Sequence, residues 1–247
     1  MQKVYRVEYA GRRVRYSFLC PLTKHLFRDF IAEDGGGECD IRLTPELLEA
    51  ARKLLPARMR DEYVEYRALI EPTARKLLEF GMCIFHSAAF VREGRAWLLT
   101  APSGVGKTTQ YLNWQRLFPN EIEMICGDMP VLERAEDGII VHATSWCGKE
   151  RIGKRGLSAP LAGVVLLEQA NENRLEPLPP HDAIMPFFEQ FIVRPETEKE
   201  IRELASVMDT LVGSVPLYRF ANLGDDASTN LLRELTNEVK GAPNDKI

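Results

Sequence analysis

The segment that most constrains this chain is APSGVGKT, residues 101–108, which follows the apolar run RAWLLT and precedes a predicted helix from Lys107 to Phe118. A strand, a glycine-containing loop and a Lys-Thr pair that opens a helix form the context in which a P-loop binds phosphate. The first position is Ala101 where the pattern has glycine, which is a tolerated variant. The segment therefore predicts an α/β fold with a phosphate-binding loop at the end of a strand.

The residues of this loop have separate expected roles. Backbone N–H groups of the loop and of the helix N-terminus bind β-phosphate oxygens. Lys107 neutralises charge between the β- and γ-phosphates, and Thr108 ligates Mg²⁺ through its hydroxyl. We therefore expect ATP and Mg²⁺ as cofactors. The predicted nucleotide-binding residues are Ser103, Gly104, Val105, Gly106, Lys107, Thr108 and Thr109.

The composition limits the other classes of function. The 247 residues are 45% hydrophobic and 28% charged, with a net charge of −4, so the chain lacks the overall basic field that draws proteins to nucleic acid or anionic membranes. No run approaches the ~18 apolar residues of a membrane span, and the N-terminal segment lacks the apolar core of a signal peptide. We expect a cytoplasmic protein that binds neither nucleic acid nor membrane.

The chain divides into three predicted parts. Residues 1–80 form a small α+β appendage, with short strands in residues 1–32, a helix capped at Thr44 and a further helical stretch that Pro72 kinks or restarts. Residues 81–240 form the P-loop domain, a mixed sheet flanked by helices, in which an amphipathic helix ends at Gly213. Residues 241–247 are a flexible tail.

A tight hairpin before the P-loop places one histidine near it. The runs MCIFHSAAFV and RAWLLTA are separated by a two-residue turn, which fixes the pairing register. If Arg92 pairs with Arg95, His86 falls opposite Ala101. His86 is therefore expected to orient phosphate or Asp128 through a hydrogen bond, the alternative being a histidine that simply packs within the strand.

A carboxylate is expected on the other side of the same site. Asp128 ends an apolar strand about twenty residues after the P-loop, where such folds place a carboxylate beside Mg²⁺. That strand would run parallel to the P-loop strand and end in the same crevice. Asp128 is thus the second predicted metal ligand, with Thr108, and the structural alternative is an aspartate that forms a turn before Met129-Pro130.

A basic segment follows in the next hairpin. Taking Asp137-Gly138 as the loop between PVLER and IIVHATSW sets Asp128 opposite Cys147 and brings GKERIGKR close to the carboxylate. We expect Lys149 first and Arg151 second to reach the γ-phosphate, where charge spreads in the transition state. A solvated charged loop is the alternative. The predicted catalytic residues are therefore Asp128, His86, Lys149 and Arg151.

Together these motifs resemble the HPr kinase/phosphorylase family and its smaller relatives, with distant similarity to the core of ATP-dependent phosphoenolpyruvate carboxykinase. The shared pattern is FHSAAF, a hairpin, SGVGKT, an acidic strand end, a Gly-basic segment and a strand like VPLYRF, roughly within 80–240. The resemblance implies a kinase fold in which an aspartate near Mg²⁺ takes the proton of a serine hydroxyl while ATP donates its γ-phosphate. Asp128 matches that aspartate and His86 the family's histidine, with Lys107 and Thr108 on the nucleotide.

The chain departs from this family in two places. The family commonly has two adjacent aspartates where this chain has Gly127-Asp128. Either Asp128 is both the metal ligand and the base, or the base is Glu150 or a neutral His86. The longer C-terminal region that handles HPr is not evident here. The acceptor is therefore left open among a serine in a protein or peptide, free serine and another small hydroxyl.

Three functions follow in order of preference. The first is an HPr-kinase-like serine or hydroxyl kinase that uses Mg²⁺ and ATP. The second is a nucleotide-binding regulatory protein with little or no kinase activity, which the missing second aspartate suggests. Carboxykinase activity is third, because the chain is short for that family's extra substrate domain. The reverse reaction and assembly into a homo-oligomer are left open.

Overall fold

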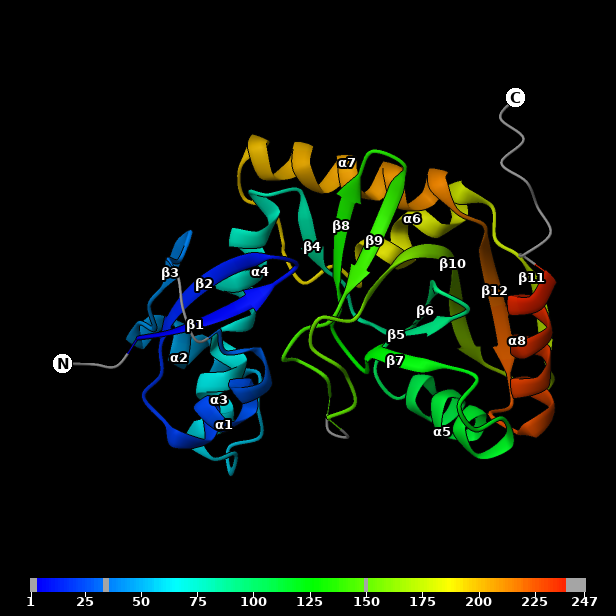
Figure 1. Cartoon of the computed structure of the whole chain (residues 1–247), viewed down its shortest axis with the longest axis horizontal. Helices are drawn as coiled ribbons and strands as arrows, with labels where there is room; N and C mark the ends of the chain where they lie inside the picture. Colours follow the sequence, from blue (N-terminus) through cyan, green and yellow to red (C-terminus); the bar gives the residue numbers. More distant parts are fainter. Residues whose placement is uncertain (1–3, 33–35, 149–150, 239–247) are drawn as a thin grey trace.

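The computed structural model describes residues 4–32, 36–148 and 151–238. Its elements are β1 (Val4–Tyr9), β2 (Arg12–Ser17), α1 (Pro21–Phe27), η1 (Arg28–Phe30), β3 (Cys39–Ile41), α2 (Pro45–Lys53), α3 (Asp61–Ala68), α4 (Ile70–Leu78), β4 (Met82–Ile84), β5 (Ser87–Arg92), β6 (Arg95–Thr100), α5 (Lys107–Leu117), β7 (Glu123–Cys126), β8 (Val131–Ala135), β9 (Gly138–His142), β10 (Ser158–Gln169), β11 (Arg174–Pro177), α6 (Pro180–Phe188), α7 (Glu198–Ser214), β12 (Leu217–Asn222) and α8 (Asp226–Glu238). They form a mixed α/β chain with a small sheet followed by a larger, curled mixed sheet (Figure 1). No helix in these ranges is long and apolar enough to cross a membrane.

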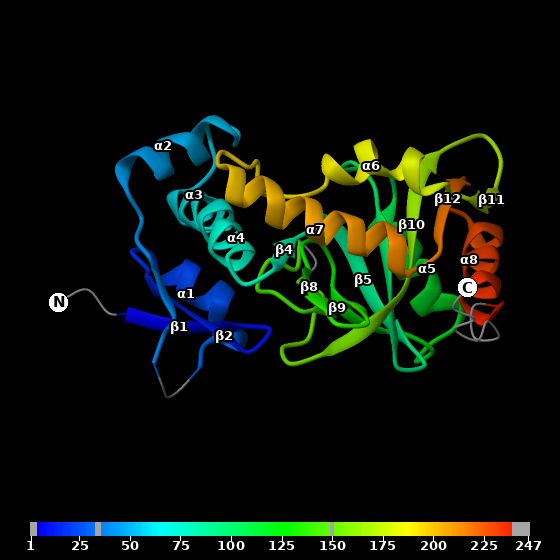
Figure 2. The ribbon, with the colours of Figure 1, turned by 90° about the horizontal axis from the view of Figure 1, so that it is seen from above.

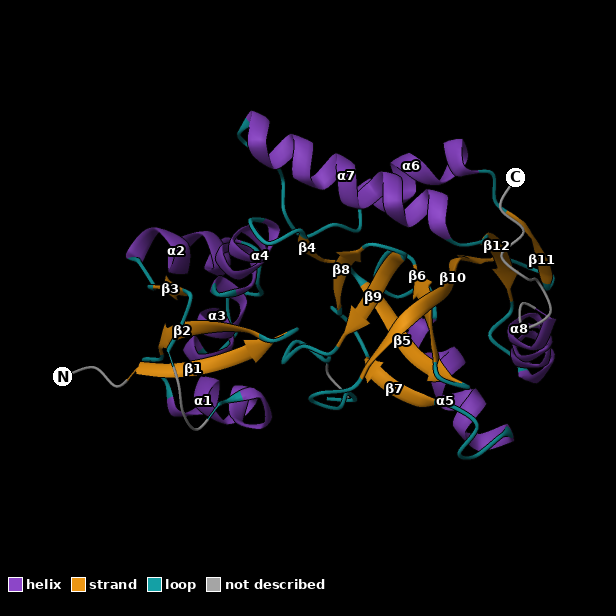
Figure 3. Cartoon of the chain, turned by 45° about the horizontal axis from the view of Figure 1, so that its top comes forward, coloured by secondary structure: helices purple, strands orange, loops and turns teal. Residues whose placement is uncertain are grey.

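Residues 4–80 form what we call the N-terminal unit. β1 and β2 make a hairpin whose turn residues, Ala10 and Gly11, have φ of 49° and 75°, as a tight turn with two positive φ values requires. β3 pairs with β2 in parallel, and α1 to α4 lie beside this sheet (Figure 3). Residues 4–80 therefore contain both helices and strands, and their standing as a separate appendage stays a prediction.

Two details of this unit differ from the sequence prediction. Strands alone were expected for residues 1–32, whereas Pro21 opens the helix α1. Proline suits that position because the first N–H groups of a helix have no partner within it. The predicted restart at Pro72 lies slightly earlier, at Leu69 between α3 and α4, and Pro72 occupies the first turn of α4. Thr44 caps α2 as predicted.

The larger sheet has the strand order β4-β8-β9-β10-β6-β5-β7, with β12 beside β10 and β11 beside β12. β6, β10 and β12 run parallel to one another. β10 pairs with β9 through its first residues and with β6 and β12 through later ones, so the sheet curls around it. Because parallel strands end at the same edge, the loops that follow β6, β10 and β12 lie together.

Helices cover both faces of this sheet (Figures 1 and 2). Ala96 and Leu98 of β6 belong to the buried core that includes residues of α6 and α7. Trp97 and Leu99 point the other way and belong to the core shared with α5 and α8. This two-residue alternation is typical of a strand that is covered on both faces, and it produces three layers, helix, sheet and helix.

Two elements of the C-terminal half also differ from expectation. α7 begins at a capping box formed by Thr197 and Glu200, and it continues through Gly213, the predicted end, to Ser214. β11 is an additional edge strand that pairs with β12 and that the sequence did not indicate.

Aromatic rings join the N-terminal unit to the larger sheet around Trp146. Tyr9 stacks on Trp146 with ring centroids 5.5 Å apart, and Phe27 meets it edge-on at 5.4 Å. Tyr66 donates its hydroxyl to the carbonyl oxygen of Ser145 at 2.8 Å. Tyr9, Phe27 and Trp146 belong to the same buried core as α6 and α7, so one apolar cluster spans both parts of the chain.

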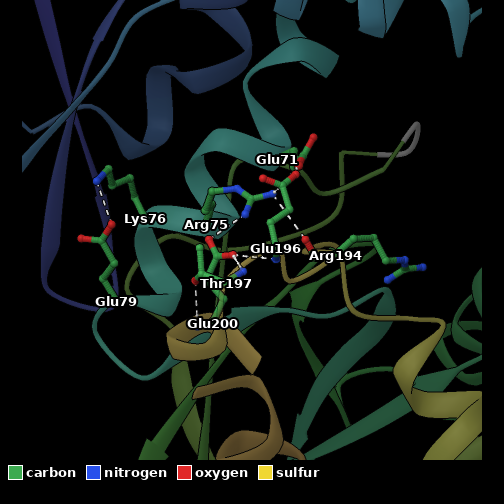
Figure 4. A network of polar contacts seen from close by, with 8 residues as sticks. All are labelled: Glu71, Arg75, Lys76, Glu79, Arg194, Glu196, Thr197 and Glu200. Carbon is green, nitrogen blue, oxygen red and sulfur yellow. Dashed lines mark hydrogen bonds and ion pairs between the residues drawn. The ribbon is translucent and has the colours of Figure 1, made fainter. Parts of the chain in front are cut away.

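Ion pairs form a second junction, between α4 and the start of α7 (Figure 4). The Arg75 guanidinium lies 2.6 Å from Glu200 and 3.1 Å from Glu196. It also pairs with Glu71 one turn earlier in α4, at 3.0 Å. The backbone N–H of Glu196, and after it Arg75, lower the pKa of Glu200 to about 2. The start of α7 is thus held to the N-terminal unit by a charged cluster.

Candidate functional site

The hairpin before the P-loop has the predicted register. Arg92 pairs with Arg95, and the ladder continues to Ser87 and Thr100, one position before His86 and Ala101. The hydroxyl of Thr100 donates to the carbonyl oxygen of His86 at 3.0 Å. His86 therefore lies beside the start of the P-loop.

The strand that carries His86 bends there, which the sequence did not predict. β4 pairs with β8, whereas β5 pairs with β6 and β7. At the break between β4 and β5, the N–H of Ser87 donates to the carbonyl oxygen of Asp128 at 2.9 Å. Segments 82–92 and 123–133 therefore face each other along one antiparallel ladder that bends at His86. The bend brings His86 and Asp128 together.

The imidazole of His86 lies between two polar partners. Its Nε2 is 3.3 Å from Oδ1 of Asp128, and its Nδ1 is 3.0 Å from Oε1 of Gln190. The Gln190 amide nitrogen donates to the carbonyl oxygen of Pro186 at 3.4 Å, so its oxygen faces the ring. Because an amide oxygen only accepts, this arrangement assigns the hydrogen to Nδ1 and presents Nε2 to Asp128.

Gln190 is a site residue that sequence reasoning missed. It follows α6 and is 6% exposed. Its backbone carbonyl oxygen also accepts a hydrogen bond from the backbone N–H of His86, at 2.8 Å. The available signal was a single uncharged polar residue within the apolar run FFEQFIV. Buried polar groups are almost always hydrogen-bonded, but the sequence does not reveal with which partner.

The segment predicted to be a P-loop connects β6 to α5, which is the strand–loop–helix arrangement that the prediction requires. Gly104 and Gly106 have φ of 89° and 120°, and a Cβ at either would meet nothing within 4 Å, so glycine is needed for the backbone conformation. The Lys107 amine donates to the carbonyl oxygens of Ala101 at 2.7 Å and Pro102 at 3.3 Å. Burial lowers the pKa of Lys107 to about 8, an effect that Asp128 opposes.

One pocket of about 320 Å³ joins the P-loop to the His86–Asp128 pair. Of the predicted nucleotide-binding residues, Val105 does not line the pocket, because its side chain packs against the core shared with α5. A contact of Val105 with phosphate would use its backbone N–H. The residues that line the pocket are His86, Ser103, Gly104, Gly106, Lys107, Thr108, Thr109, Gly127, Asp128 and Gly148.

The two predicted magnesium ligands, Thr108 and Asp128, both line this pocket. Within the described ranges no group of three or more His, Cys, Asp and Glu side chains is placed to hold a metal ion. Magnesium bound with a nucleotide takes one or two protein oxygens and completes its shell with phosphate oxygens and water. A hydroxyl and a carboxylate beside a loop predicted to bind phosphate fit that requirement.

The second hairpin is shifted from its predicted register. Ala135 pairs with Gly138, so the loop is Glu136-Asp137 and the pairing moves by two residues. The expected proximity survives, since Gly148 lines the pocket with Asp128.

The basic run after this hairpin is only partly brought to the site. Lys149 and Glu150 lie outside the described residues. Arg151 is absent from the pocket lining and donates to the carbonyl oxygen of Leu26 in α1 at 3.2 Å. Lys154 pairs with Glu123 at 2.6 Å. The described side chains of this run therefore bind other parts of the protein, and a role for Arg151 or Lys149 at the γ-phosphate stays a prediction.

Gly127 explains why this chain has one aspartate at the strand end. A Cβ at this position would lie 2.8 Å from the carbonyl oxygen of Cys147 and 3.2 Å from that of Ile152. The backbone N–H of Gly127 donates to the same Ile152 oxygen at 2.8 Å. A second carboxylate here would require the backbone at Cys147 and at Ile152 to move.

No protein-family model matches this chain, and no curated protein matches it. Among solved structures, the chain is similar to the Hpr(Ser) kinase/phosphatase from Coxiella burnetii, with 13% sequence identity and a TM-score of 0.36. The alignment covers 64% of this chain and 93% of that chain. Overlap at that score carries no weight for fold or function, so the site rests on the geometry of this chain alone.

Proposed function

We propose that this protein transfers the γ-phosphoryl group of ATP to a hydroxyl acceptor, a serine in a protein or peptide, or free serine. The observation that carries the proposal is a single pocket lined by both the P-loop and the His86–Asp128 pair. Phosphate binding alone requires only the P-loop. A carboxylate in the same pocket adds a group that can accept the proton of an attacking hydroxyl.

The P-loop residues bind and orient the nucleotide in this proposal. Backbone N–H groups of residues 103–108 meet the phosphate oxygens, as at other helix N-termini. Lys107 exchanges its contacts with loop carbonyls for contacts with the β- and γ-phosphates. Thr108 and Asp128 hold Mg²⁺, which when bound neutralises charge that develops on the phosphates.

Asp128 has two tasks in this proposal, since Gly127 leaves no space for a neighbouring carboxylate. His86 contacts its Oδ1, and in this proposal a hydrogen on Nε2 completes that contact, which leaves Asp128 ionised and able to take the proton of the acceptor hydroxyl. Oδ2 is then the oxygen proposed to meet the acceptor hydroxyl. Gln190 fixes the His86 ring, so the carboxylate is held in one orientation.

The test is the Asp128→Asn variant of the full chain with Mg²⁺ and γ-labelled ATP, offered to free serine and to serine-containing peptides. We expect transfer to fall by about 10³-fold, because general bases contribute about 10²–10⁴-fold, while the Kd for ATP changes by less than about threefold. Asp137→Asn, in the exposed hairpin turn, is the matched control and should transfer normally. Equal losses of ATP binding and transfer would remove the base assignment.

A nucleotide-binding regulatory protein with little or no kinase activity is the second candidate. The observation in its favour is the single carboxylate, which the packing of Gly127 against Cys147 imposes. This function predicts ATP binding of normal strength, no labelled product with any offered hydroxyl, and partner binding that depends on ATP. The same labelled assay therefore separates the two candidates.

A further inference from the structure

The loops at the parallel edge of the sheet contact the P-loop. Gln169, the last residue of β10, donates its amide to the carbonyl oxygen of Gly104 at 3.2 Å. Gly224, in the loop after β12, is close to Thr109, because a Cβ on Gly224 would lie 3.6 Å from the Thr109 methyl carbon. Gly104 and Thr109 both line the pocket. The pocket is therefore flanked by the loops after β10 and β12.

The loop after β12 is fixed, yet it exposes an apolar side chain. The N–H of Leu223 donates to the side-chain oxygen of Asn173 at 2.8 Å. The carbonyl oxygen of Gly224 accepts the side-chain amide of Asn113 on α5 at 2.9 Å. Leu223 is nevertheless 52% exposed. Leu223 is thus an exposed apolar residue on a loop whose backbone is fixed next to the pocket-lining Thr109, and such a residue is suited to pack against a ligand.

The pocket gives a bound nucleotide a direction. His86 and Asp128 lie on the side of β6 where β5 and β7 run, and transfer requires the γ-phosphate to face them. With the β-phosphate on the P-loop, the nucleoside then extends away from Asp128. That direction leads past Thr109 toward the loop after β12, at the edge where open α/β sheets bind their ligands.

We propose that Leu223 and the loop 222–225 form the subsite for the base of the nucleotide and that a purine ring packs on Leu223. This inference rests on the proposed function, because the triphosphate on the P-loop is what places the base. A purine is preferred to a pyrimidine because its two fused rings cover more of the leucine side chain, and apolar contact grows with the area removed from water.

The experiment compares ATP, CTP and inorganic tripolyphosphate, each with Mg²⁺, by calorimetry on the full chain. We expect ATP to bind more tightly than CTP, and CTP more tightly than tripolyphosphate. Leu223→Ala should raise the Kd for ATP by about fivefold to tenfold, a factor consistent with partial loss of one leucine contact, and leave that for tripolyphosphate unchanged. Leu54→Ala, at a 67% exposed leucine in the N-terminal unit, is the matched control and should change neither.

A second variant gives a direct optical signal. Leu223→Trp places an indole where the base is proposed to lie, so ATP should quench its emission while tripolyphosphate should not. The three native tryptophans are buried, and subtracting the wild-type titration removes their contribution.

The outcomes separate this inference from the proposed function. Tripolyphosphate binding that equals ATP binding, or a Leu223→Ala variant with unchanged ATP affinity, would overturn the base subsite while leaving the P-loop assignment standing. Equal losses of affinity for ATP and for tripolyphosphate in Leu223→Ala would also overturn it, since Leu223 would then support the P-loop and would not contact the base. A wild-type chain that binds neither ligand would overturn both.

Discussion

The P-loop strand β6 has an antiparallel neighbour on one side and a parallel neighbour on the other, and the two sides bring different groups to the pocket. The antiparallel side, β5 and β7, supplies His86 and Asp128 through a bend in a continuous ladder. The parallel side, β10 and β12, adds none of its described residues to the pocket lining but places Gln169 on the carbonyl oxygen of Gly104 and the loop after β12 beside Thr109. Under the proposals made above, transfer chemistry lies on the first side and nucleotide recognition on the second.

Lys107 lies between the two sides, so replacing it is expected to reduce both phosphoryl transfer and ATP binding. Lys107→Met keeps the apolar part of the side chain and removes the cation. We expect transfer to fall by about 10³-fold and the Kd for ATP to rise by about 10- to 100-fold, because hydrogen bonds to charged groups contribute about 1.5–3 kcal/mol. Labelled transfer and calorimetry measure the two effects. Normal ATP binding would show that Lys107 does not contact the phosphates.

Gln190 belongs to the antiparallel side alone, so its variants should separate the two functions. Gln190→Leu removes the acceptor for His86 Nδ1, and we expect kcat to fall by about 10- to 100-fold, as is usual when a residue that orients a site group is lost. The Kd for ATP should stay within about twofold. Gln190→Glu keeps an acceptor oxygen for His86 Nδ1 but loses the amide donor to Pro186, so it should recover part of the activity. Equal loss in the two variants would assign Gln190 a packing role only.

The pH dependence of ATP binding should report on Lys107. Burial lowers the pKa of this amine to about 8, below the usual value near 10.4, and phosphate binds the protonated form. The Kd for ATP should therefore be level below pH 8 and rise above it, by up to about tenfold per pH unit. Lys107→Met should remove this dependence. A wild-type Kd that is level from about pH 7 to 9.5 would contradict it.

Arg75 belongs to neither side of β6, and its replacement should have the smallest effect. Arg75→Ala breaks contacts with Glu200 and Glu196, and we expect a loss of about 1 kcal/mol in the free energy of unfolding at pH 7 with ATP binding unchanged. Arg202→Ala, which removes an exposed pair with Glu198, is the matched control and should cost less.

The free energy of unfolding at low pH tests the same contact. The pKa of Glu200 is lowered to about 2, so its contribution is present above its unfolded value near 4.3 and is lost as pH falls toward 2. The difference between wild type and Arg75→Ala should shrink over that range. Urea unfolding at several pH values measures it, and a difference that is constant with pH would exclude Glu200 as the partner that matters.

Features set by local chemistry could be predicted from the sequence. The Gly-Lys-Thr pattern predicted a loop between the end of a strand and the start of a helix, because strand, loop and helix start are each encoded within a few residues. The two-residue turn fixed the register from Arg92 to Ser87, because a short hairpin leaves little freedom. The parallel direction of β6 and β7 was also expected, although β5 lies between them.

Features set by distant parts of the chain were not predicted. The bend at His86 arises because β4 pairs with β8 whereas β5 pairs with β6. No residue near His86 encodes that change of pairing partner. Gln190 reaches His86 across 104 positions. Arg151 turns to the carbonyl of Leu26, a contact that depends on where the N-terminal unit packs. The register of the second hairpin differs by two residues from the prediction because Gly138, with φ of 131°, follows the two-residue loop and is not part of it.

The rings around Trp146 also couple the unfolding of the two parts of the chain. Opening either part alone would expose the indole face that stacks on Tyr9, and Trp146 lies two positions from Gly148 in the pocket lining. Heating or denaturant should therefore melt the N-terminal unit and the P-loop region in one cooperative transition. A truncated chain that begins near residue 81 would leave exposed the parts of Trp146 that Tyr9 and Phe27 contact.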